Sequence, residues 1–94
     1  MTIIHIENTV RDYDAWKAMF DTDPLDRKNS GVRRYTIARA ADNPDAVVID
    51  LELETTEQAQ TMLASLHEMW QRLGDVFVDA PTGRIFDVAE TKEL

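Results

Sequence analysis

The 94-residue chain has the length of a single domain, so no second hydrophobic core is expected. Its 18 acidic and 10 basic residues give a formal charge of −8, which disfavours nucleic acid and anionic membranes as partners. The absence of cysteine excludes disulfides, thiolate nucleophiles and cysteine-ligated metals. The first residues, Met1–His5, lack the features of a signal peptide, and no apolar run is long enough to form a membrane helix. We therefore expect a soluble cytoplasmic protein.

The first third of the chain predicts a strand followed by a helix. Residues Thr2–Asn8 alternate, with Ile4 and Ile6 on one face, as a strand with one buried side does. Asp12 suits the N-cap of a helix over Tyr13–Asp21, in which large apolar side chains recur at helical spacing.

The next segment predicts a short helical turn and then a hairpin. Leu25–Ser30 is expected to form the helical turn, closed by Gly31 in the left-handed region. The turn residues 42–45 separate a strand over Val32–Ala40 from one over Val47–Glu54. Extrapolating the register from that turn places four residues of the Val32–Ala40 strand on the same face as Val48 and Asp50: Arg33, Tyr35, Ile37 and Arg39.

The last third predicts a long helix, a loop and a final strand. Thr55 is the expected N-cap, and Gln58 would complete a capping box. An apolar stripe then follows helical spacing: Ala59, Met62, Leu63, Leu66, Met69, Trp70 and Leu73. Gly74 is expected just beyond the end of this helix, residues 75–82 form a loop, and residues 83–90 form the last strand.

The predicted order of elements is β-α-β-β-α-β, the α+β, ferredoxin-like arrangement. Its four-stranded antiparallel sheet has the first and third strands at the centre and both helices on one face. The other face has no cover, although it mixes apolar and polar side chains: Ile3, His5, Tyr35, Ile37, Val48, Asp50, Phe86 and Val88. Such a face in a small domain favours a homodimer packed sheet to sheet, with His5, Tyr35, Val48 and Asp50 in the interface.

The chain resembles the dimeric α/β-barrel superfamily in this order of elements and in two segments. These are Val10-x-Asp12-Tyr13-Asp14-x-Trp16-Lys17-x-x-Phe20-Asp21, at the entry to the first helix, and Gly31-Val32, at the start of the second strand. The superfamily includes antibiotic-biosynthesis monooxygenases, polyketide cyclases and haem-degrading monooxygenases. The resemblance covers nearly the whole chain. It implies a dimer with a ligand cavity in each subunit, between the sheet and the helices.

The resemblance to the cofactor-independent monooxygenases implies a site for an aromatic or polyketide-like substrate, with no bound cofactor. By residue type, Asn8, Trp70 and Arg84 would be catalytic, with Trp70 stacking on a ring and Arg84 stabilising a phenolate or peroxide anion. Four more residues would contact the ligand: Tyr13 (or Tyr35 in its place), Trp16, Met62 and His67. Each of these residues also has a purely structural interpretation.

Other functions remain open at this stage. His5 and Asp50 could form a general-base pair, a metal site with Glu7, or a hydrogen bond that orients two subunits, and we favour the last. No bound metal is therefore expected. The haem-degrading branch has a histidine downstream of its tryptophan, and this chain has none after His67. The main alternative to an enzyme is a non-catalytic dimer that binds a metabolite or a partner.

Overall fold

A computed structural model describes residues 1–94 as one antiparallel sheet with two helices. The elements are β1 (Thr2–Val10), α1 (Tyr13–Asp21), β2 (Val32–Ala40), β3 (Asn43–Leu53), α2 (Thr56–Arg72), a 3₁₀ turn (Gly74–Val76) and β4 (Phe77–Asp87). The strands lie in the order β2-β3-β1-β4, with β1 and β3 at the centre. The predicted α+β, ferredoxin-like fold is confirmed.

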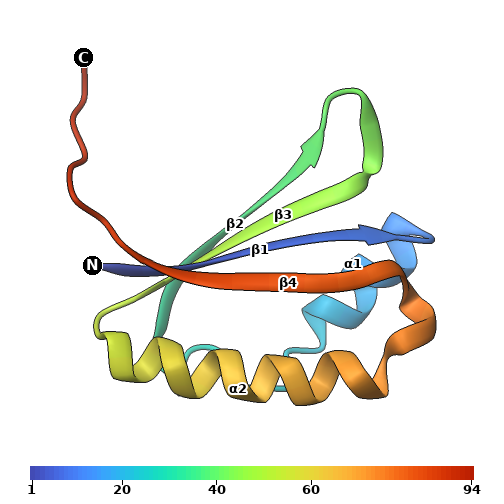
Figure 1. The fold of residues 1–94 in the computed structure, drawn as a ribbon, viewed down its shortest axis with the longest axis horizontal. Helices are drawn as coiled ribbons and strands as arrows, with labels where there is room; N and C mark the ends of the chain where they lie inside the picture. The colour runs from blue at the N-terminus through green and yellow to red at the C-terminus, as the bar shows by residue number, and fades with distance from the viewer.

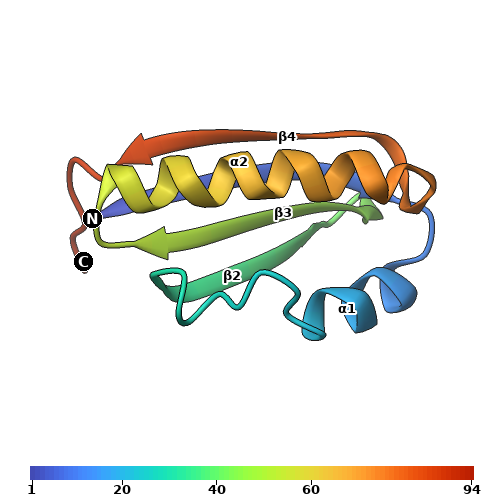
Figure 2. The ribbon, with the colours of Figure 1, turned by 90° about the horizontal axis from the view of Figure 1, so that it is seen from below.

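Both helices lie on one face of the sheet, and no element covers the other (Figure 1). Seen from the helix side, α2 runs along the centre of the sheet, while α1 and the chain that follows it lie towards β2 (Figure 2). We call the uncovered side the open face. None of the helices is long and apolar enough to cross a membrane.

The hydrophobic core lies between the sheet and the two helices. Alternate residues of β1 and β3 point into it, including Ile4 opposite Leu51 and Ile6 opposite Ile49. The helices contribute one buried side chain from α1, Trp16, and four from α2: Ala59, Met62, Leu66 and Trp70. The alternation along the strands and the helical spacing therefore predicted the core correctly.

The two N-caps were also predicted correctly. Asp12 accepts hydrogen bonds from the backbone of Asp14 and Ala15, and the Thr55 hydroxyl accepts one from the backbone of Gln58 at 3.1 Å. The capping box at α2 is only half formed, because Oε1 of Gln58 is buried without a hydrogen-bond partner. The Gln58 side chain instead lies against Gly31, whose φ is +101°, in the left-handed region as expected.

The predicted helical turn over Leu25–Ser30 is only partly formed: the backbone N–H of Ser30 donates to the Asp26 carbonyl at 2.9 Å, but the segment is not a continuous helix. This segment forms consecutive turns, and Asp23 and Asp26 have φ values of 54° and 50°. Left-handed residues interrupt a right-handed helix. The backbone N–H of Arg27 instead donates to the Asp23 carboxylate at 2.9 Å, which fixes the loop locally.

The predicted face of β2 is wrong. The hairpin is tighter than expected, with Ala40 opposite Asn43, and its register is irregular between Arg39 and Ala40. As a result Ile37 lies opposite Ile49, and Tyr35 lies opposite Leu51, on the helix side of the sheet. A shift of one residue moves every side chain to the other face. Arg34, Thr36 and Ala38 therefore occupy the open face in place of Arg33, Tyr35, Ile37 and Arg39, and Tyr35 has no place in an interface there.

The last strand begins earlier and ends earlier than predicted. Residues 77–82, expected to be loop, pair with the end of β1, although the register shifts twice in this region. Pro81 has no N–H to donate, and it is tolerated because β4 is an edge strand. The strand ends at Asp87, so Val88 lies outside the sheet.

Candidate functional site

A small internal cavity lies between the sheet and the helices. Its volume is about 60 Å³, and sixteen residues line it, of which thirteen are hydrophobic. The three others are Asn8, Pro24 and Arg27. We call this space the inner cavity.

The sheet supplies one wall of the inner cavity. Ile6 and Asn8 from β1 and Ile49 and Leu51 from β3 contribute side chains, because they point to the helix side of the sheet. Asn8 is opposite Val47 in the β1–β3 ladder, and its side chain is 8% exposed. The Asn8 Oδ1 atom is buried and accepts no hydrogen bond.

An unpaired buried amide oxygen is unfavourable by about 1–3 kcal/mol, and few such groups occur in native proteins. An apolar side chain of similar size would avoid this penalty. The Asn8 oxygen is thus free to accept a hydrogen bond inside the cavity.

Aromatic rings from α1 form a second wall. Trp16 and Phe20 both line the inner cavity, with ring centroids 5.2 Å apart. Tyr13 packs behind Trp16 at 5.7 Å, and the Arg39 guanidinium lies 3.8 Å from the Tyr13 ring centroid. Tyr13 supports the aromatic wall from outside and does not line the cavity.

Trp70 brings the indole of α2 to the same space, and Gly83 allows it to lie close to β4. A Cβ atom at Gly83 would lie 3.2 Å from Cη2 of Trp70 and 2.7 Å from Cδ1 of Leu63. Any larger residue at this position would displace these two side chains. Gly83 was predicted only as the start of a strand, and its packing role could not be read from the sequence.

Methionine is concentrated at the inner cavity. The chain has four methionines, and apart from Met1 all of them line this space: Met19, Met62 and Met69. Methionine is unbranched and flexible, so it adapts to ligands of different shape. The cavity wall can therefore change shape without unfolding the strands.

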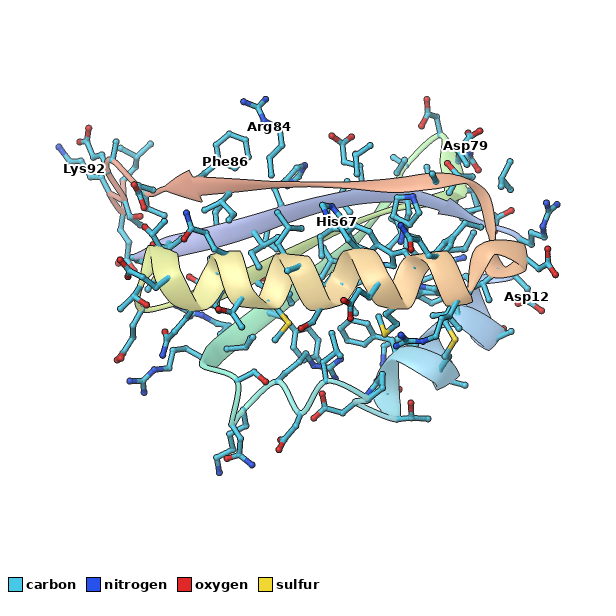
Figure 3. The ribbon with its side chains drawn as sticks, turned by 60° about the horizontal axis from the view of Figure 1, so that its bottom comes forward. Asp12, His67, Asp79, Arg84, Phe86 and Lys92 are labelled. Atoms are coloured by element: carbon cyan, nitrogen blue, oxygen red, sulfur yellow. The ribbon has the colours of Figure 1, made fainter.

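Four of the predicted site residues meet at the inner cavity: Asn8, Trp16, Met62 and Trp70. The other three, Tyr13, Arg84 and His67, do not line it. Arg84 lies opposite His5 on the open face, and Figure 3 shows its side chain projecting from β4 on the side away from α2. His67 is exposed on α2, with its ring 5.3 Å from that of Trp70.

Arg27 is the cavity residue that the sequence analysis missed. Its guanidinium carbon lies 3.9 Å from the Phe20 ring centroid, and its Nη1 donates to the Phe20 carbonyl at 3.0 Å. The side chain is 17% exposed. The spacing of four residues from Asp23, with which Arg27 forms an ion pair, was the available signal, but the loop geometry could not be predicted.

The predicted His5–Asp50 pair forms on the open face. Nδ1 of His5 lies 2.6 Å from Oδ1 of Asp50, and Nε2 lies 3.6 Å from a Glu7 carboxylate oxygen. No group of three or more histidine or acidic side chains is placed to hold a metal ion. The hydrogen bond to Asp21 raises the pKa of Lys17, and this pair lies outside the cavity.

Solved structures with the same fold span the whole chain. Three of them are named "putative antibiotic biosynthesis monooxygenase". The one from Deinococcus radiodurans has a TM-score of 0.75 and 14% identity, and covers 100% of this chain and 98% of its own. The one from Nitrosomonas europaea has a TM-score of 0.64 and 19% identity, and covers 96% and 100%.

A further structure, a dimeric ferredoxin-like protein from an uncultured marine organism, has a TM-score of 0.66 and 10% identity, and covers 100% of both chains. The chain has the fold of these proteins. At such identities the likeness is one of fold, and function has to be argued from the site. No protein-family profile matches the chain, and no curated protein matches it.

Replacing Asn8 by leucine tests whether its amide is kept for a ligand. Asn8→Leu has nearly the same shape and removes the unpaired oxygen, so the free energy of unfolding of the ligand-free protein should rise by about 1 kcal/mol. Urea unfolding followed by circular dichroism measures this. Gln58→Met, at the other buried unpaired oxygen but outside the inner cavity, is the matched control and should also stabilise. A loss of 1 kcal/mol or more in Asn8→Leu would mean that the amide is structural.

Proposed function

We propose that the protein is a homodimer that binds a small planar aromatic molecule in the inner cavity and oxygenates it without a bound cofactor. The observation that carries this proposal is the buried, unpaired Oδ1 of Asn8 within an otherwise apolar cavity. A phenolic hydroxyl on the ligand would donate a hydrogen bond to this oxygen. The aromatic rings of the ligand would pack against Trp16 and Trp70.

The side chains at the cavity fit the chemistry of an electron-rich phenol. Arg27 is a permanent cation, and placed beside the ligand it would stabilise the phenolate form. A phenolate passes electrons to O₂ more readily than the neutral phenol does. For a phenolic anthrone, whose central ring contains a CH₂ group, the overall reaction converts this CH₂ into C=O. One oxygen atom of O₂ enters the substrate and the other leaves as water, so the substrate supplies all four electrons.

The cavity has to widen to admit such a substrate. Its volume of about 60 Å³ is well below that of a pocket for a drug-sized ligand, which is at least about 300 Å³. The three methionines in its wall and the Pro24–Leu25 part of the loop after α1 are the elements that would move. Binding would then be accompanied by repacking of side chains around a fixed sheet.

The second candidate is a non-catalytic dimer that binds a small metabolite. The small volume of the cavity favours it, as does the chemistry of its lining. Apart from the amide of Asn8 and the guanidinium of Arg27, no polar side chain lines the cavity, so no residue there can act as a general base. Oxygen consumption separates this candidate from the enzyme.

The dimer belongs to the same proposal. On the open face, Ile3 lies between Glu52 and Phe86, and Phe86 is 39% exposed. Phe86 lies edge to face with His5, which is hydrogen-bonded to Asp50, and a second copy related by a two-fold axis would cover these side chains. Two of the structures with this fold are named dimeric.

Oxygen uptake in the presence of a phenolic anthrone tests the enzymatic function. The protein should consume one mole of O₂ for each mole of quinone formed. Asn8→Leu should lower kcat/KM at least tenfold, which corresponds to a loss of about 1.4 kcal/mol of transition-state stabilisation. Lys92→Gln, in the C-terminal tail, is the control and should have normal kcat/KM. Tight binding of the anthrone without O₂ consumption would contradict the oxygenase and favour the non-catalytic candidate.

Sedimentation velocity at micromolar concentration tests the dimer. The wild-type protein should sediment as a dimer, and Val48→Arg should be a monomer because it places a long charged side chain in the proposed interface. Ala64→Arg, on the exposed side of α2, adds the same charge and should remain dimeric. A monomeric wild-type protein would rule out the dimer. A dimeric Val48→Arg variant would show that the interface is not on the open face.

A further inference from the structure

A second hollow lies on the outer surface, next to the inner cavity. It is an open groove of about 910 Å³ bounded by the loop after α1, the start of β2 and the first turn of α2. Four basic residues line it, namely Arg27, Lys28, Arg33 and Arg34, against two acidic ones, Asp23 and Glu54. The groove thus takes four of the ten basic residues of the chain but only two of its eighteen acidic residues. We call it the basic groove.

Arg27 lines both the inner cavity and the basic groove. Its guanidinium carbon lies 3.9 Å from the ring centroid of Phe20, which lines the cavity, and 5.0 Å from that of Tyr35, which lines the groove. The two rings meet edge to face at 5.1 Å. Phe20, Arg27 and Tyr35 therefore lie where the two spaces adjoin.

The hydrogen-bonding capacity of Arg27 is only partly used. Nη1 donates to the Phe20 carbonyl, and Nε lies 3.4 Å from Oδ1 of Asp23. The Nη2 atom donates to no group of the protein, and a guanidinium binds a carboxylate through two parallel N–H groups. Lys28, the next residue, is exposed and forms no ion pair, whereas Arg33 and Arg34 are paired with Glu54 and Glu52. Two neighbouring basic residues are thus available to an anion.

We propose that the ligand of the inner cavity is an aromatic acid, whose rings occupy the cavity and whose anionic group lies in the basic groove at Arg27 and Lys28. This inference rests on the proposed ligand site and specifies its chemical class. In a protein of charge −8 an anionic ligand is repelled at long range, so a local excess of basic residues has to offset that repulsion. Arg27 lines both spaces, so its positive charge lies where an acid group attached to a ring in the cavity would be.

Two fluorescent probes that differ only in charge test the inference. 1-Anilinonaphthalene-8-sulfonate and the neutral N-phenyl-1-naphthylamine share the same ring system, and only the first carries an anionic group. The wild-type protein should bind the sulfonate at least tenfold more tightly at 20 mM NaCl, and this preference should shrink at 500 mM NaCl because salt screens the charges. Asn8→Leu should weaken the binding of both probes if they enter the inner cavity.

Single charge removals locate the anionic group. Arg27→Gln should abolish the preference for the sulfonate, and Lys28→Gln should lower it about threefold while leaving the affinity for the neutral probe unchanged. Lys28 is exposed and has no partner, so Lys28→Gln remains informative if Arg27→Gln does not fold. Lys92→Gln removes the same charge from the C-terminal tail and should bind both probes as the wild type does.

The outcomes separate this inference from the proposed function. Equal affinity for the two probes would overturn the aromatic acid but leave the ligand site intact. A preference for the sulfonate that persists in both Arg27→Gln and Lys28→Gln would overturn its placement in the basic groove. Failure of both probes to bind would overturn the inference together with the ligand site itself.

Discussion

The alternation of side chains along β1 is the constraint on which the rest of the structure depends. Because β1 pairs with both β3 and β4, its side chains are held in alternation between the two faces of the sheet, at Asn8 by the pairing with Val47 of β3 alone. Ile4, Ile6 and Asn8 consequently point to the helices, and His5 points to the open face. The same strand thus supplies the amide of the inner cavity and the histidine of the proposed interface, with a single backbone separating the two environments.

The aromatic residues of α1 convert this arrangement into a site. Tyr13, Trp16, Phe20 and Tyr35 follow one another with ring centroids 5.1–5.7 Å apart, and the guanidinium groups of Arg39 and Arg27 lie over the rings at the two ends. Such cation–π contacts contribute about 0.5–1 kcal/mol each at exposed positions. This chain of rings holds α1 against the sheet, whereas Met62 and Met69 of α2 leave the cavity adaptable.

The stability of the ligand-free protein and its proposed function make opposite demands at Asn8. An apolar side chain at this position would stabilise the ligand-free protein, since it would remove the buried amide oxygen that has no hydrogen-bond partner. A polar group kept in an unfavourable environment is typical of a binding site, because the ligand supplies the missing partner. The His5–Asp50 pair differs in this respect, since its hydrogen bond is complete without any ligand.

The sequence predicted the fold, the helix bounds at α1 and four of the sixteen residues that line the inner cavity, because these depend on periodicity and capping within a single element. Tyr35 was placed on the wrong face, since its parity depends on an irregular hairpin that no local pattern reveals. Arg84 was taken as the cation of the site from its residue type alone, whereas its register opposite His5 turns it to the open face. Arg27 is the basic residue that lines the inner cavity, and its loop contains two residues in the left-handed region, Asp23 and Asp26, which no periodic pattern predicts.

The central claim is that a ligand binds between Trp16 and Trp70, and the indole N–H signals of the two tryptophans test it most directly. The chain has only two tryptophans, so a ¹⁵N-labelled sample gives two such signals, and Trp16→Phe identifies which is which. On titration with 1-anilinonaphthalene-8-sulfonate, both signals should shift and follow one saturation curve. Saturable binding that leaves both indole signals unmoved would contradict a ligand site in the inner cavity.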